Sequence, residues 1–222
     1  VDGGAGTDSI TSRSTVTTGA SIGASLQNIE NHTLRIDHDG GAADVFTYDM
    51  SDMTGVSTLK LDRLNNSGAT ADAVVTVSGA GFAQTVTTEI SAGDTGADNS
   101  SIDVTLSYQG AAGTGDSASL IFDGAAANAV TIAGMETVNI AAQTNDTTSS
   151  TTGASSINSL QVANATTVNV TGTGALTLGS QLLGTALNAA ATVTVNASAN
   201  TGGVSFVSEA NTLTFTGGTG AD

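Results

Sequence analysis

Apolar and polar residues alternate in short runs along almost the whole chain, and the 3.6-residue period of a helix is nearly absent. The runs are rich in Thr and Val, and the residues between them are mostly Gly, Asn, Asp and Ser, which favour turns. We therefore expect an all-β fold built from short strands. The expected strands are residues 33–36, 45–48, 58–61, 74–77, 85–90, 102–106, 120–122, 137–140, 167–170, 176–178, 192–195, 204–206 and 212–215, and residues 181–191 are the one stretch with a helical pattern.

The chain of 222 residues contains no proline and no cysteine. Average usage would give about eleven prolines in a chain of this length, so their absence favours a fold in which most backbone N–H groups donate to a strand ladder. Without cysteine there is no disulfide and no thiolate zinc site. Rigidity must therefore come from ladders, packing or another metal.

A degenerate unit recurs at uneven spacing: an apolar residue, a short polar step and an alternating strand. It occurs at residues 29–36, 56–61, 135–140 and 165–170. Such a unit buries its inward residues only when neighbours cover it, which favours a parallel β-solenoid, a stack of short strands with loops of variable length. The alternative is a β-sandwich of the immunoglobulin type, which explains the alternation but predicts hairpins and a buried Trp. The chain has no Trp.

Composition changes near residue 125. Residues 1–125 are rich in Asp and hold all the Lys and Arg, whereas residues 126–222 are rich in Thr, Ala and Asn. We expect two solenoid regions divided there, within one continuous elongated segment of a larger protein.

The net charge is −16, with only four Lys and Arg residues. This charge opposes binding to nucleic acid and to anionic lipid, so neither is an expected partner. No apolar run approaches the roughly 18 residues that span a bilayer, and direct membrane insertion is not expected. A divalent cation would relieve the repulsion among the carboxylates.

Both ends of the chain carry the G-G-x-G-x-D turn that is typical of calcium-binding repeats. Glycine permits the positive φ angles of such a turn, and aspartate supplies the hard oxygen ligands that Ca²⁺ prefers. The candidate calcium residues of these turns are Gly3, Gly4, Gly6 and Asp8 at one end and Gly217, Gly218, Gly220 and Asp222 at the other. Ordinary glycine-rich turns are the alternative.

Three internal acidic stretches are weaker candidates for calcium ligation. The first holds Asp37, Asp39 and Asp44, the second holds Asp94 and Asp98 with Asp103 in the following strand, and the third ends at Asp116. The first departs from an EF-hand, because it has no glutamate at the position of the twelfth ligand and no flanking helices. Solvated turns, which Asp favours through hydrogen bonds to its own backbone, explain them equally well.

Nothing in the sequence assembles a catalytic centre. His32 and His38 are the only histidines, and the sequence does not position a nucleophile beside either of them. Sugar-binding sites usually present aromatic side chains on which the sugar stacks. The chain has only two Tyr and no Trp, which is too few to suggest such a site. We expect a protein that is not an enzyme.

Several segments resemble the calcium-dependent crystalline surface-layer (S-layer) proteins of Caulobacter type. The resemblance lies in the two terminal turns, in residues 26–36 (LQNIENHTLRI) and in residues 132–142 (IAGMETVNIAA), and it extends over nearly the whole chain. It implies a structural protein secreted by a type I pathway to the bacterial cell surface, where it folds on meeting Ca²⁺ and assembles with copies of itself into a two-dimensional lattice. Calcium ligation by Asp8, Asp222 and the carbonyl groups beside their glycines is implied by the motif match.

The resemblance also implies that any anchoring to cell-surface polysaccharide uses regions outside this segment. Two other functions share the same local features. One is a module of a secreted calcium-binding adhesin, and the other is the non-catalytic calcium-binding part of a secreted enzyme.

Overall fold

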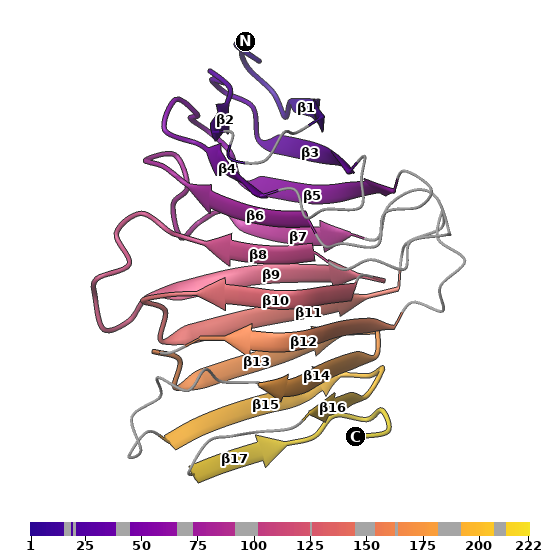
Figure 1. The fold of residues 1–222 in the computed structure, drawn as a ribbon. Helices are drawn as coiled ribbons and strands as arrows, with labels where there is room; N and C mark the ends of the chain where they lie inside the picture. The colour runs from indigo at the N-terminus through magenta and orange to yellow at the C-terminus, as the bar shows by residue number, and fades with distance from the viewer. Residues whose placement is uncertain are drawn as a thin grey trace.

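The computed structural model describes residues 1–15, 19, 21–38, 45–65, 73–91, 102–124, 126–144, 154–162, 164–181, 192–206 and 212–222. These residues form seventeen strands and no helix, so the described part of the chain also has no helix long and apolar enough to cross a membrane. The strands are arranged in two facing sheets that run the length of the molecule (Figure 1).

The first sheet contains the nine odd-numbered strands in chain order. These are β1 (Ser9–Thr15), β3 (Asn31–His38), β5 (Thr58–Asn65), β7 (Thr87–Ser91), β9 (Ser117–Asp123), β11 (Thr137–Gln143), β13 (Thr167–Gly172), β15 (Thr192–Asn200) and β17 (Thr212–Thr216). The second sheet contains the eight even-numbered strands. These are β2 (Ser21–Gly23), β4 (Val45–Asp49), β6 (Ala73–Ser78), β8 (Ile102–Leu106), β10 (Ala126–Ile132), β12 (Ser155–Gln161), β14 (Leu176–Gln181) and β16 (Val204–Phe206).

The chain crosses from one sheet to the other after every strand, so one odd and one even strand make a rung of the stack. Each strand pairs in parallel with the strand one rung away; β3, for example, pairs with β1 and β5. Figure 1 shows the arrows of the two sheets running in opposite directions. The predicted parallel β-solenoid is confirmed. The immunoglobulin-like alternative is wrong for the described strands, because its sheets are antiparallel.

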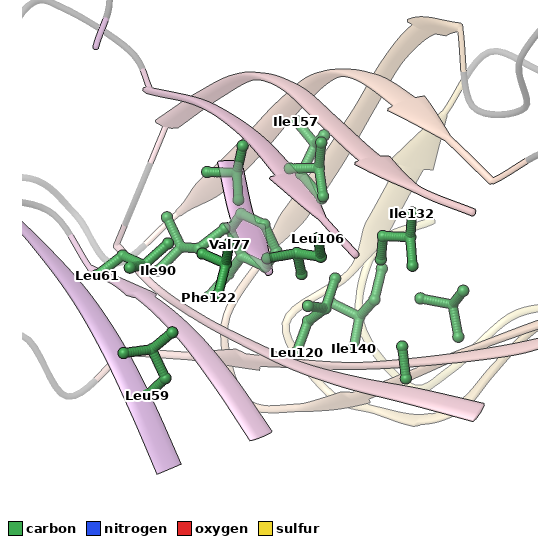
Figure 2. Packing of buried hydrophobic residues seen from close by; sticks show 14 of the residues in the cluster. Leu59, Leu61, Val77, Ile90, Leu106, Leu120, Phe122, Ile132, Ile140 and Ile157 are labelled. Atoms are coloured by element: carbon green, nitrogen blue, oxygen red, sulfur yellow. The ribbon is translucent and has the colours of Figure 1, made fainter. Parts of the chain in front are cut away.

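The core lies between the two sheets and is filled by alternate residues of the inner strands, whereas β17 at the end of the stack is exposed along its length. Leu61, Ile90 and Phe122 are register neighbours on β5, β7 and β9, and all three are buried. Figure 2 shows them in the space between the sheets, together with Val77 from the opposite sheet. Full burial of a side chain of this size contributes about 1.5–3 kcal/mol to the free energy of folding. Each added rung therefore adds to the stability of the stack.

The recurring sequence unit occupies the corner before strands of the nine-stranded sheet. Its first apolar residue is buried in each copy: Ile29, Val56, Met135 and Ala165. The polar residues that follow hold the corner together, because one carbonyl oxygen accepts hydrogen bonds from two successive N–H groups of the next rung. The Glu30 carbonyl oxygen accepts hydrogen bonds from the backbone N–H groups of residues 57 and 58, and the Glu136 carbonyl oxygen accepts them from residues 166 and 167.

Every predicted strand overlaps an observed one, but β1, β2, β10 and β12 were not expected. Gln181, the first residue of the stretch with a helical pattern, ends β14, and residues 182–191 lie outside the described residues. Strand pairing is continuous across the change in composition near residue 125, because β11 pairs with β9 and β10 pairs with β8.

Candidate metal-binding turns

The two terminal G-G-x-G-x-D turns lie far apart. Residues 3–8 precede β1 at one end of the stack, and residues 217–222 follow β17 at the other end (Figure 1). Because all strands of the nine-stranded sheet are parallel, a turn before β1 and a turn after β17 also lie at opposite ends of the strands. Any ion held by one turn is therefore independent of the other.

The N-terminal turn packs tightly on the next rung. The Gly3 N–H donates to the Gln27 carbonyl oxygen at 3.0 Å. A Cβ on Gly3 would collide with the Asn28 carbonyl oxygen and would lie 2.8 Å from Asp8 Oδ2. The absence of a side chain at Gly3 thus lets two oxygen atoms approach the same point. Gly4 and Gly6 have φ angles of +83° and +131°, which favour glycine.

Asp8 is the candidate ligand that this turn positions. Its backbone N–H donates to Glu30 Oε2 at 2.8 Å, and its carbonyl oxygen accepts from the Asn31 N–H at 3.0 Å. Its Oδ2 atom is buried and has no hydrogen-bond partner among the described residues. A buried carboxylate oxygen without a donor is costly unless a cation or a water satisfies it.

Asp2 and Asn28 are neighbours of this turn that sequence reasoning missed. Asp2 Oδ1 accepts hydrogen bonds from Asn28 Nδ2 at 2.9 Å and from the Gly4 N–H at 3.0 Å. These two bonds hold the pKa of the Asp2 carboxyl below its usual 3.8. Asn28 has a φ of 51°, the only positive φ of a non-glycine residue in the described ranges. Asp2 precedes the motif, so the pattern did not include it.

The C-terminal turn uses its aspartate differently. Asp222 Oδ2 accepts from the Gly218 N–H at 2.8 Å, and Oδ1 accepts from the Val204 N–H at 2.9 Å. The Thr219 N–H donates to the Asn200 carbonyl oxygen at 3.2 Å. Both oxygens of the Asp222 carboxylate therefore join this turn to its own rung and to the start of β16 by hydrogen bonds to backbone.

Asp116 repeats this arrangement inside the chain. Its Oδ2 accepts from the Gly113 N–H at 2.7 Å and its Oδ1 accepts from Gln84 Nε2 at 2.9 Å. The Asp116 N–H donates to Glu136 Oε2 at 2.9 Å, as the Asp8 N–H does to Glu30. The carboxylate thus closes its own turn, and both of its oxygens have donors.

The remaining predicted ligands do not converge in the described residues. Asp103 lies on β8, where its Oδ1 accepts from the Ala129 N–H of β10 at 2.9 Å. Asp37 lies on β3 in register with Thr15 and Leu64. Asp39, Asp44, Asp94 and Asp98 lie outside the described residues.

The oxygen atoms of the N-terminal turn are better placed to bind a hard cation than those of the other turns. Asp8 Oδ2 and the Asn28 carbonyl oxygen both lie against Gly3, and no hydrogen-bond donor in the described part of the chain contacts Asp8 Oδ2. Within the described ranges no three His, Cys, Asp or Glu side chains gather closely enough to hold a metal, so a shell of six to eight oxygens would need carbonyl groups and water. Calcium binding by these turns stays a prediction.

Comparison of the chain with protein-family models, with curated proteins and with solved structures gave no match.

Proposed function

We propose that this chain is a structural, non-enzymatic segment of a bacterial surface layer, stabilised by Ca²⁺ and assembling with copies of itself into a two-dimensional lattice at the cell surface. The observation that carries the proposal is the uninterrupted parallel pairing from β1 to β17 in one sheet and from β2 to β16 in the other. Such a stack is an elongated body with two long, regular faces. Regular faces suit repeated contacts between identical copies.

The outer faces support this proposal through columns of short, uncharged polar side chains. Thr47, Thr76, Thr105 and Thr131 are in register on the eight-stranded sheet. Asn139, Asn169 and Asn196 are in register on the other sheet, and Asn169 Nδ2 donates to Asn139 Oδ1 at 2.9 Å. These two columns carry no charge, so two copies could approach along them with little repulsion.

Calcium would act at the N-terminal turn through Asp8 and the Asn28 carbonyl oxygen. When bound, the ion supplies positive charge to a chain of net charge −16. The role of the chain's own residues is to hold two oxygens together beside Gly3. An ion bound only by the folded chain would raise its stability.

Negative-stain electron microscopy tests the proposal. The full chain would be dialysed into buffer with millimolar Ca²⁺, with Mg²⁺ at the same concentration, or with EGTA. We expect planar arrays with a fixed repeat in Ca²⁺ only. Unbranched single fibres in Ca²⁺ would favour the adhesin alternative, and dispersed particles under all three conditions would contradict self-assembly.

A further inference from the structure

His32 of β3 is buried in the core of the first rungs. Its side chain is 1% exposed, and its neighbours in register are Ile10 of β1 and Leu59 of β5. An imidazole in this column replaces the aliphatic side chain that packing alone would favour. It therefore brings a titratable group into the core.

The ring makes polar contacts to two other strands. The Tyr48 hydroxyl of β4, in the opposite sheet, lies 3.2 Å from His32 Nδ1 and 3.1 Å from Nε2. Ser12 Oγ of β1 lies 3.1 Å from Nε2. Tyr48 is 2% exposed, and the two ring centroids are 5.5 Å apart. The contact thus joins the two sheets across the core.

The residues of the neighbouring strands that contact the imidazole or pair with His32 in register bring no countercharge. β1 presents Ile10 and Ser12, β5 presents Leu59, and β4 presents Tyr48, the one titratable group among these. Arg13, Arg35, Asp49 and Lys60 of the same strands lie at the alternate, outward positions, and Asp62, which is buried, lies in register with Arg35 and pairs with it at 3.1 Å. A proton on His32 would therefore place an uncompensated charge in the core.

We propose that His32 is an acid-sensitive latch: when it is protonated, the contact with Tyr48 is lost and the rungs formed by β1 to β5 open, while the later rungs stay paired. This inference goes beyond the proposed function and does not depend on calcium or assembly. Stacked repeats can open at one end, because each rung contacts only its neighbours.

Burial supports the direction of the effect. It lowers the pKa of His32 from 6.5 to about 4, and it raises the pKa of the Tyr48 hydroxyl, which stays neutral. The unfolded chain binds the His32 proton first as pH falls. Neutral His32 therefore contributes fully to folding stability above pH 6.5, and this contribution is lost progressively between pH 6.5 and pH 4. The loss lowers the folding equilibrium constant on the order of a hundredfold.

Urea unfolding at pH 7.5 and pH 4.5 tests the latch. The comparison uses the wild type, His32→Gln and, as a matched control, His38→Gln. Acid also protonates carboxylates, but their effect on stability is common to the three proteins and cancels in the comparison. Between pH 7.5 and pH 4.5, the folding equilibrium constant of the wild type and of His38→Gln should fall by a factor that is tens of times larger than the factor for His32→Gln. Equal losses in all three proteins would overturn the proposal.

A second measurement uses the unsubstituted chain and decides the matter if His32→Gln does not fold. Histidine NMR titration and amide exchange would be followed from pH 7 to pH 4. We expect the His32 ring to stay neutral until the amides of β1 to β5 lose protection, with those of β11 to β15 still protected. A His32 ring that titrates near pH 6.5 while β1 to β5 remain protected would contradict the latch.

Discussion

At the scale of single residues, the tight stacking depends on glycines for which no side chain has room. Gly172, at the end of β13, has a φ of +98°, and a Cβ there would collide with the Ala142 carbonyl oxygen of the neighbouring rung. Gly115 lies in an exposed turn, and a Cβ there would meet no atom within 4 Å. The same residue type therefore has a structural role at one position and none at the other.

This contrast gives a matched pair of substitutions. Gly172→Ala should lower the free energy of unfolding by about 2 kcal/mol or more, because both the backbone conformation and the contact are unfavourable. Gly115→Ala should change it by less than about 0.5 kcal/mol. Chemical denaturation followed by circular dichroism measures both. Equal effects of the two substitutions would show that the corner at Gly172 is looser than described.

At the scale of elements, neighbouring strands are joined on their outer face by ion pairs as well as by the ladder. Lys60 Nζ of β5 lies 3.0 Å from Glu89 Oε1 of β7. Burial works to lower the Lys60 pKa, but Glu89, Asp62 and Asp123 together outweigh it and raise the pKa above 10.5. The charged pair therefore stabilises the fold below pH 10.5, and this contribution is lost as pH rises through the higher folded-state pKa.

A double-mutant cycle measures this pair. With Lys60→Gln, Glu89→Gln and the double variant, we expect a coupling energy of up to about 1 kcal/mol at pH 7 in low salt, because both side chains are partly exposed. The coupling should shrink in 1 M NaCl. A coupling of zero in low salt would mean that the two strands are held by the ladder and core alone.

The elements also show which parts of the fold the sequence could reveal. The strand at residues 137–140 was predictable because Val138 and Ile140 alternate with polar residues, and the same pattern is observed in β11. β1 is mostly Ser and Thr, and β12 holds three Ser with only two apolar residues, so their pattern is weak. β10 begins with Ala and Asn, which have low strand propensity. These strands form because a neighbouring rung pairs with them, and that pairing is not visible in a local window.

The candidate site was predictable in part for a similar reason. The glycines and Asp8 are adjacent in sequence, so the motif reveals them. The Asn28 carbonyl oxygen and the Glu30 carboxylate come from the next rung, and their approach depends on the stacking register. The motif also did not distinguish Asp8, which has an oxygen without a donor, from Asp222, whose two oxygens accept backbone N–H groups.

At the scale of the whole molecule, stability is the sum of contacts between adjacent rungs, opposed by repulsion within a chain of net charge −16. The core supplies the attraction through one continuous cluster of buried side chains. A divalent cation bound at a corner would reduce the repulsion and hold the first rung on the second. We therefore propose that Ca²⁺ binding is coupled to folding.

Thermal unfolding of the full chain, followed by circular dichroism in saturating Ca²⁺ and in EGTA, tests this claim most directly. We expect Ca²⁺ to raise Tm by several degrees, since a ligand at about 100 times its Kd adds about 2.7 kcal/mol to the free energy of unfolding. Mg²⁺ should raise it less, and Asp8→Asn should remove most of the Ca²⁺ effect. Superimposable melting curves in Ca²⁺ and EGTA would contradict the account.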